Sequence, residues 1–364
     1  MKKKQGQISV FQLFCLLYSS RMVGTFIYLF RLRGYMESGD RIASAFTYLL
    51  FSVLFAVPAL ICIKQQPNAD ILTQTEVISP SFSRITAALD AIVFLWGCIL
   101  TVSRFGLFAS SVLLLQKNLL LFIFILLSAA VFCASKGLEP LARTGVIFTF
   151  ILVSSLCFSS STLLADFDID NLSRPFQNGA QDVINESFFA ACRNIETTAL
   201  LFIYPDVNGK VKKAFFGWIL SFSVSVASFF ALVGGVMGHY GDLQMFPLHT
   251  LSVLAQAPVA ERMDDLLNGI WVVCVMIKIA FLLYVFRNII AHIFKKDLQT
   301  LPLLFGGAAT YAGYLVLSRT IDGFAKTLLF PGNWLGYLLV TVLIPCCIFI
   351  FGKHKKNKTK RVTK

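Results

Sequence analysis

Two apolar segments of the chain each carry a short polar stretch near their centre. Residues 19–25 read Ser-Ser-Arg-Met-Val-Gly-Thr, and residues 192–197 read Cys-Arg-Asn-Ile-Glu-Thr. In a membrane helix such side chains face a cavity or a partner, because exposing them to lipid is costly. Where a helix is interrupted at such a point, its free N–H groups attract a carboxylate and its free carbonyls attract an ammonium group or a cation. An α-amino acid carries both groups, so the paired stretches predict a binding site for a small amino-acid-like ligand.

The candidate ligand-binding residues belong to these two stretches. They are Ser19, Ser20, Arg21, Gly24 and Thr25 in the first, and Asn194, Glu196, Thr197 and Thr198 in the second. The missing side chain of Gly24 permits close approach of a ligand and unusual dihedral angles. In the competing interpretation the hydroxyl groups bond their own helix backbone, and Gly24 is a notch for helix packing.

Two of these candidates are charged, and each has two roles open to it. Arg21 either faces the cavity as the partner of an anion or forms an internal pair with Glu196 or another acid. Glu196 either contacts a cationic ligand or accepts a proton, or it forms an ion pair with Arg193.

Polar side chains also occur in two further apolar segments. Lys278 either substitutes for a sodium ion near the first polar stretch, fixing the structure or carrying a proton, or it snorkels to the inner interface. Thr101 and Arg104 share a helical face with Gly97 and Phe108. We interpret that face as an inner vestibule or a packing seam rather than as a ligand contact.

The elements that position these residues are predicted to be membrane helices. The chain has 364 residues, of which 57% are hydrophobic and only 14% charged, a composition typical of a protein solvated by lipid. A helix needs about 20 largely apolar residues to cross a bilayer. About ten segments qualify, namely 8–30, 42–63, 88–114, 119–135, 142–164, 183–204, 214–237, 264–286, 301–318 and 334–352.

The distribution of basic residues predicts the orientation and the domain organisation. If both termini are cytoplasmic, inner segments hold about 20 Lys and Arg residues against about eight outside, in line with the positive-inside bias. We expect a single transmembrane permease domain: a five-helix repeat in 1–164, a second in 183–352 and a basic cytoplasmic tail in 353–364. Five spans followed by five have opposite orientations, as the inverted repeats of a LeuT-like fold require, with helices 1 and 6 broken.

Other classes of function lack support in the sequence. The net charge of +13 comes from the ends of apolar segments and from the tail, not from a basic face with interleaved aromatic residues, so no nucleic-acid partner is expected. The nine Cys and four His residues show no metal-ligand spacing, and no nucleotide-binding or hydrolase motif occurs. We therefore expect no metal, no cofactor and no enzymatic activity.

Several segments resemble the bacterial endospore germination permeases, the GerAB-like B subunits of nutrient germinant receptors. The resemblance rests on residues 246–251, 260–266 and 271–280, on residues 196–213 with Tyr204-Pro205-Asp206, on the opening 8–13 and on the basic tail. It implies the amino acid–polyamine–organocation superfamily, a LeuT-like fold and the spore inner membrane. It also implies an A-type membrane subunit and a C-type lipoprotein as partners, besides membrane lipid.

By position, Glu196 and Lys278 are the charges that this resemblance carries over, whereas Arg21 replaces small residues that usually precede the glycine of the first span. Two functions follow as hypotheses. One is a nutrient-sensing receptor subunit, in which an amino-acid-like ligand shifts a transporter-like equilibrium. The other is a proton-coupled amino-acid transporter or exchanger that works by alternating access.

Overall fold

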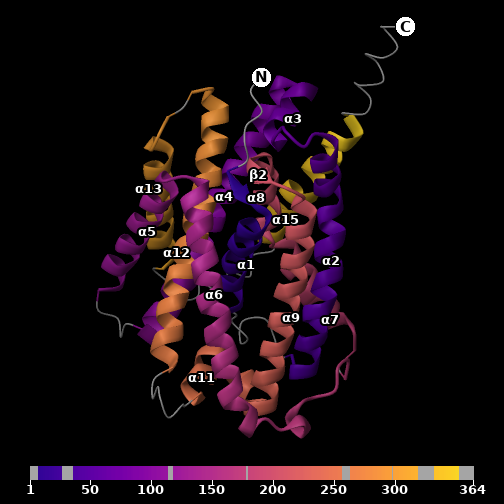
Figure 1. Cartoon of the computed structure of the whole chain (residues 1–364), viewed down its shortest axis with the longest axis vertical. Coiled ribbons are helices and arrows are strands. Elements are labelled where there is room, and N and C mark those ends of the chain that lie inside the picture. The colour runs from indigo at the N-terminus through magenta and orange to yellow at the C-terminus, as the bar shows by residue number, and fades with distance from the viewer. Residues whose placement is uncertain are drawn as a thin grey trace.

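The computed structural model describes residues 7–26, 36–113, 118–177, 179–255, 263–296, 298–318 and 332–351. These residues form a bundle of helices, with two strands of two residues each as the only β-structure among them (Figure 1). The predicted all-α membrane architecture is therefore confirmed. The predicted basic tail, 353–364, lies outside the described residues.

Six helices of the described chain are long and apolar enough to span a bilayer, and two shorter apolar helices accompany them. The long helices are α2 (Ser38–Gln65), α4 (Pro80–Phe108) with the π-helical turn η2 (Ala109–Leu113), α6 (Leu138–Leu163) with η3 (Leu164–Asp166), α9 (Val211–Met237), α12 (Met263–Phe294), and α15 (Gly332–Leu338) continued by η6 (Leu339–Leu343) to Phe351. The shorter ones are α5 (Leu119–Ser135) and α13 (Leu301–Leu317).

The other elements connect these helices or lie inside the bundle. They are β1 (Ile8–Ser9), α1 (Val10–Phe26), α3 (Ile71–Ile78), η4 (Ile169–Asn171), α7 (Gln181–Cys192), α8 (Ile195–Ile203), η5 (Tyr204–Asp206), β2 (Val207–Asn208), α10 (His239–Leu243) and α11 (Pro247–Leu254). Each of the ten predicted spans coincides with one or two of the helices. The third begins eight residues earlier than predicted, because Pro80 starts α4 as the first residue of the helix.

Helices α1 and α12 form the interior of the bundle. Figure 1 shows α1 near the middle, and it packs against α6, α9 and α12. Most side chains of helix α12 from Ile270 to Ile289 are buried, which is typical of a helix enclosed by others. At its Trp271 end, the indole ring packs edge-on against Phe108 with the ring centres 4.1 Å apart.

The predicted break in the sixth span is confirmed. Helix α7 ends at Cys192 and α8 begins at Ile195, with Arg193 and Asn194 outside helical geometry. A helix end inside the bundle leaves carbonyl groups without partners in their own helix, and side chains must supply those partners. The last carbonyl groups of α7 therefore need hydrogen-bond donors from outside their own helix.

The predicted break in the first span at residues 19–25 is wrong. Helix α1 is continuous from Val10 to Phe26, so the whole polar stretch is helical. The physical reason is that this stretch needs no break to satisfy its polar groups: the Ser19 hydroxyl donates to the carbonyl of Leu16 in its own helix, and the Ser20 hydroxyl donates to Glu196. The remainder of the predicted span, 27–30, lies outside the described residues.

A short parallel ladder joins the beginning of α1 to the segment that follows α8. Ile8 pairs with Val207 and Ser9 with Asn208. In Figure 1 this ladder lies at the upper end of the bundle, near α3, while α11 lies at the lower end. The two helices that carry the polar stretches are thus connected at one end by main-chain hydrogen bonds.

Candidate functional site

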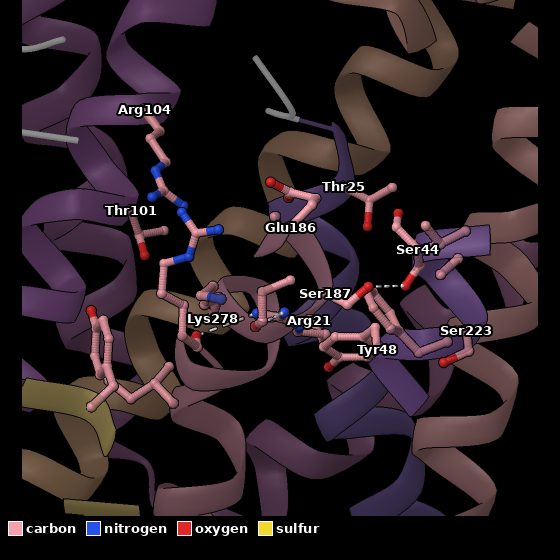
Figure 2. A pocket seen from close by; sticks show the side chains of 18 of the residues that line it. Arg21, Thr25, Ser44, Tyr48, Thr101, Arg104, Glu186, Ser187, Ser223 and Lys278 are labelled. Atoms are coloured by element: carbon pink, nitrogen blue, oxygen red, sulfur yellow. Dashed lines mark hydrogen bonds between the residues drawn. The ribbon is translucent and has the colours of Figure 1, made fainter. Parts of the chain in front are cut away.

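A cavity of about 120 Å³ lies beside the break between α7 and α8. That volume exceeds the 10–15 Å³ needed for one water molecule by roughly an order of magnitude, so it has room for a small organic molecule. Figure 2 shows polar side chains from several helices converging on it. Six of the candidate site residues predicted from the sequence line it, namely Arg21, Gly24, Thr25, Thr101, Arg104 and Lys278.

A buried ion pair forms one side of the site. The Lys278 ammonium of α12 donates to the Glu196 carboxylate of α8 across 2.7 Å, and it also lies 3.3 Å from the carbonyl oxygen of Ser20. The Ser20 hydroxyl donates to the same Glu196 oxygen at 2.9 Å. Three helices therefore meet at one carboxylate. Of the alternatives for Glu196, an ion pair is present, and its partner is Lys278.

The other Glu196 oxygen, Oε2, is buried and accepts no hydrogen bond from the described residues. The Glu196 side chain is fully enclosed. A buried carboxylate is stabilised when all its lone pairs are satisfied, so this oxygen leaves capacity for one further donor.

Arg21 supplies the donors that the end of α7 requires. Its Nη2 atom donates to the carbonyl of Ala190 at 3.0 Å, and Nη1 donates to the carbonyl of Arg193 at 3.4 Å. A cation at a helix C-terminus also interacts favourably with the helix dipole. The guanidinium carbon lies 5.3 Å from the ring centres of both Tyr48 and Phe222, within range of cation–π attraction.

Arg21 thus lines the cavity and fixes the break at the same time. Its described hydrogen bonds go to main-chain carbonyls and not to Glu196. The freed carbonyls, which would otherwise suit an ammonium group, are occupied by this side chain.

Positive charge predominates in the lining of the cavity. Three guanidinium groups, Arg21, Arg104 and Arg193, and the Lys278 ammonium border it, whereas Glu186 is the one acidic residue among the lining residues that the structure describes. The Lys278 charge is compensated by Glu196, which does not itself line the cavity. Since opposite charges attract strongly where water is scarce, the arrangement favours a ligand with an anionic group.

Thr101 and Arg104 lie on the wall of the cavity. The Thr101 hydroxyl donates to the carbonyl of Gly97, one turn earlier in α4, and the side chain is among those that line the cavity in Figure 2. Gly97 itself lines the cavity, and a Cβ atom there would lie 2.7 Å from Ile195 Cδ1. The glycine therefore allows α4 to approach the start of α8.

The remaining predicted ligand residues lie behind the cavity wall. Ser19 bonds its own helix, Asn194 Nδ2 donates to the Tyr48 hydroxyl at 3.0 Å, and Thr198 Oγ1 lies 2.6 Å from Thr341 Oγ1. Thr197 is buried without lining the cavity. Ser20 reaches the site through Glu196. These residues position the wall, and only Arg21, Gly24 and Thr25 of the nine predicted ligand residues border the space.

The sequence did not indicate the parts of the wall that come from α2, α7, α9 and α15. They are Ser44, Ala45, Tyr48, Glu186, Ser187, Ala190, Phe222, Ser223, Val226, Phe230 and Tyr337. The Ser187 hydroxyl donates to the Ser44 carbonyl at 3.0 Å, which holds α7 against α2. A serine, tyrosine or phenylalanine in an apolar helix gives no signal of its own that it faces a cavity. The one available signal was Glu186, an acid only a few residues before the polar stretch.

Comparison with known proteins agrees with this architecture. The family of spore germination proteins (Spore_permease) matches residues 7–322 of the chain. A solved structure of a Na⁺-coupled sialic acid symporter in a substrate-bound outward-open state is similar, with a TM-score of 0.63 over 93% of this chain and 80% of the symporter and with 11% sequence identity. No curated protein matches the chain.

At 11% identity the likeness to the symporter concerns the fold alone. The family match, by contrast, covers most of the chain, including α1, the break between α7 and α8, and the Lys278 segment. The chain is therefore an integral membrane protein with a transporter fold and belongs to the spore germination permease family.

Proposed function

We propose that the protein is the nutrient-sensing subunit of a spore germination receptor and that its ligand is a small amino-acid-like molecule with a carboxylate group. The observation that carries the proposal is the cavity beside the α7–α8 break, lined by Arg21, Arg104 and Arg193. A guanidinium group presents paired N–H donors that match a carboxylate in geometry as well as in charge.

The ammonium group of such a ligand would need an acceptor. Arg21 occupies the α7 carbonyls that commonly serve this purpose at a broken helix. Glu186, which lines the cavity, is the acidic acceptor that the described wall offers. A zwitterion would then lie with its carboxylate toward the arginines and its ammonium group toward Glu186.

The ligand would act by changing the relative free energies of two arrangements of the helices. A ligand shifts such an equilibrium only if it binds one arrangement more tightly. The cavity is bordered by α1, α2, α4, α7, α9 and α12, so a change in their separation changes the contacts available to the ligand. The Lys278–Glu196 pair joins α12 to α8. Through this contact, a change in the position of α12 on ligand binding would be transmitted to α8.

The proposal includes the finer architecture that the sequence predicts. Residues 1–164 and 183–352 would be two five-helix repeats of inverted orientation, with both termini in the cytoplasm and the protein in the cell or spore inner membrane. An A-type membrane subunit and a C-type lipoprotein would be its partners, as in a germinant receptor of several subunits. The transporter fold and the family match support this setting.

A second function is favoured by the fold and by the buried ion pair. A proton-coupled amino-acid transporter or exchanger would use the same cavity, with a proton moving on Glu196 or Lys278 as the inner and outer halves open in turn. Sensing requires binding without net flux, whereas transport requires accumulation. This difference separates the two functions.

The test measures binding and flux on the same purified protein. Thermal shift in lipid nanodiscs, screened over amino acids, nucleosides and sugars, should give a stabilising ligand with a carboxylate, because a ligand bound to the folded state raises its stability. Arg104→Gln should weaken that shift. Vesicles containing the protein should bind the same ligand without accumulating it. Accumulation driven by a proton gradient and abolished by Glu196→Gln would establish the transporter instead.

A further inference from the structure

Asp90 is a buried acid for which the described structure supplies no hydrogen-bond donor. It lies in α4, it is 1% exposed, and neither of its carboxylate oxygens has a partner among the described residues. An ionised carboxylate in such a place lacks both water and donors, so its charged form is strongly disfavoured. The energy of this side chain therefore depends strongly on its protonation state.

Three other enclosed acid side chains of the described chain differ from Asp90 in this respect. Asp40 accepts a hydrogen bond from the main-chain N–H of Phe176 at 2.6 Å, and Glu196 accepts from Lys278 and Ser20. Asp242 lies 3.6 Å from the Arg41 guanidinium. Each of these three has a partner that stabilises its charged form, whereas Asp90 has none among the described residues.

The charged and titratable side chains on the elements around Asp90 are engaged elsewhere. Lys278 bonds Glu196 of α8, His292 Nε2 lies 3.1 Å from the Ser83 hydroxyl, and Glu76 of α3 accepts from Lys295. Arg287 of α12 also has a partner of its own. Both Asp90 carboxylate oxygens are buried and have no hydrogen-bond donor among the described residues. The other charged and titratable groups on these elements include Arg84 and Arg104 of α4, Asp265 and Tyr284 of α12, Tyr204 at the end of α8, Tyr311 and Tyr314 of α13, and Tyr337 of α15.

The position of Asp90 relates it to the candidate site. It lies on the buried face of α4 that continues through Phe94 to Gly97, and Gly97 lines the cavity. Seven residues of helix separate Asp90 from Gly97, about 10 Å along the axis. Phe94, between them, packs edge-on against Phe202 of α8 with ring centres 5.5 Å apart. Asp90 thus lies on the β1–β2 side of the cavity, and the Phe94–Phe202 contact lies between Asp90 and the cavity.

We infer that Asp90 is a proton-binding site: it holds a proton while the helices are packed as they are here, and it releases that proton when water reaches this part of α4. Protonation forms one O–H bond at a carboxylate oxygen and removes the buried charge, which no donor compensates. Entry of water stabilises the ionised form, so opening of this half of the bundle and proton release are linked. The inference goes beyond the proposed sensing function and does not depend on the identity of the nutrient.

Infrared spectroscopy of the full-length protein in nanodiscs tests the inference directly. A protonated carboxylic acid has a C=O stretching band separate from the bands of a carboxylate. At neutral pH the wild-type protein should show such a band, and labelling with ¹³C-aspartate should move it to lower wavenumber. The band should be absent from Asp90→Asn and unchanged in the control Asp182→Asn, which alters an exposed acid at the start of α7.

A second variant keeps the test decisive if Asp90→Asn does not fold. Asp90→Glu made with ¹³C-aspartate retains an acid at this position that carries no label, so its protonated-acid band should no longer respond to the aspartate label. The inference would be overturned if the wild-type spectrum had no protonated-acid band that responds to the aspartate label. The spectrum is recorded both in sodium buffer and in choline buffer, so that a bound sodium ion cannot account for the missing band. Persistence of that band in Asp90→Asn would overturn it too. Loss of nutrient binding in the thermal-shift screen affects neither result.

Discussion

The Lys278 ammonium lies 2.7 Å from the Glu196 carboxylate, so the longest described helix, α12, is joined by opposite charges to the helix that follows the break. Both side chains are buried. The pair gains its attraction from the low-dielectric interior, and it also requires both partners, because either charge alone would be uncompensated.

Removing one partner of this pair should destabilise the protein more than removing both. We expect Lys278→Met to lower the free energy of unfolding by about 3 kcal/mol, because Glu196 would remain buried and unpaired. The double variant Lys278→Met with Glu196→Gln should recover much of that loss. Thermal unfolding of the wild type, both single variants and the double variant in nanodiscs gives the coupling energy. Additive losses would contradict the pairing.

Substitution of Arg21 should lower the stability of the protein even when the charge is kept. Arg21→Lys replaces a planar fork by a single ammonium group, which cannot bond the Ala190 and Arg193 carbonyls together while contacting both aromatic rings. We expect a loss of about 1–2 kcal/mol in stability. Arg143→Lys, at an exposed pair with Glu139, serves as the matched control and should change little. Equal effects of the two substitutions would show that the α7 end does not depend on Arg21.

Filling the cavity from α1 should abolish ligand binding without unfolding the protein. A Cβ atom at Gly24 would meet no atom within 4 Å, and this glycine lines the cavity. Gly24→Leu should therefore fold, with a small gain in helix propensity, and place its side chain where the ligand lies. The control is Gly269→Leu in α12, where a Cβ atom likewise meets nothing within 4 Å and which does not line this cavity. Binding is measured by ligand-induced thermal shift, and an undiminished shift in Gly24→Leu would place the ligand elsewhere.

Ser223 offers a hydroxyl group to the cavity that has no partner among the described residues. Its removal in Ser223→Ala should leave stability unchanged, because no hydrogen bond within the described protein is lost. If the ligand bonds this hydroxyl, affinity should fall by about tenfold, the effect of about one hydrogen bond. Ser159→Ala, at another buried serine without a described partner but outside this cavity, should alter neither quantity. Titration calorimetry on both variants distinguishes the outcomes.

The contact between α3 and the end of α12 should depend on pH. The hydrogen bond and charge of Lys295, 2.9 Å from the Glu76 carboxylate, lower the pKa of Glu76 below its ordinary value. A carboxylate whose pKa is lowered by folding contributes stability above its unfolded-state pKa and loses it as the pH falls through the folded-state value. The wild type should therefore exceed Glu76→Gln in thermal stability near neutral pH by a small margin that disappears in acid. A margin that does not change with pH would exclude the ion pair as its cause.

The sequence predicted the fold well because apolar length is a local property. Each predicted span contains a helix, and the polar residues Arg193 and Asn194 correctly located the break in the sixth span. The same criterion failed at residues 19–25, where Ser19 bonds its own helix and Ser20 bonds Glu196. A polar stretch in a membrane helix signals either an interruption or a partner on another helix, and composition does not distinguish these cases.

The candidate site was less predictable because it depends on how distant helices are rotated against each other. Lys278 lies 82 residues from Glu196 in the chain, and the sequence offered the adjacent Arg193 as the simpler partner. Tyr48 and Phe222 frame Arg21 from α2 and α9, yet both read as ordinary apolar helix positions. Asp90 was overlooked because a single acid in a long helix resembles an interfacial residue until its burial is known.

The pairing of Ile8 with Val207 has a mechanical consequence. If α8 moves along its axis, the start of α1 must move with it or the hydrogen bonds of the ladder must break. Movements of these two helices are therefore coupled at this end of the bundle. A partner subunit that bound the amino-terminal residues would therefore act on α1 and α8 together. Deleting residues 1–9 removes β1 and should therefore break this connection between α1 and α8.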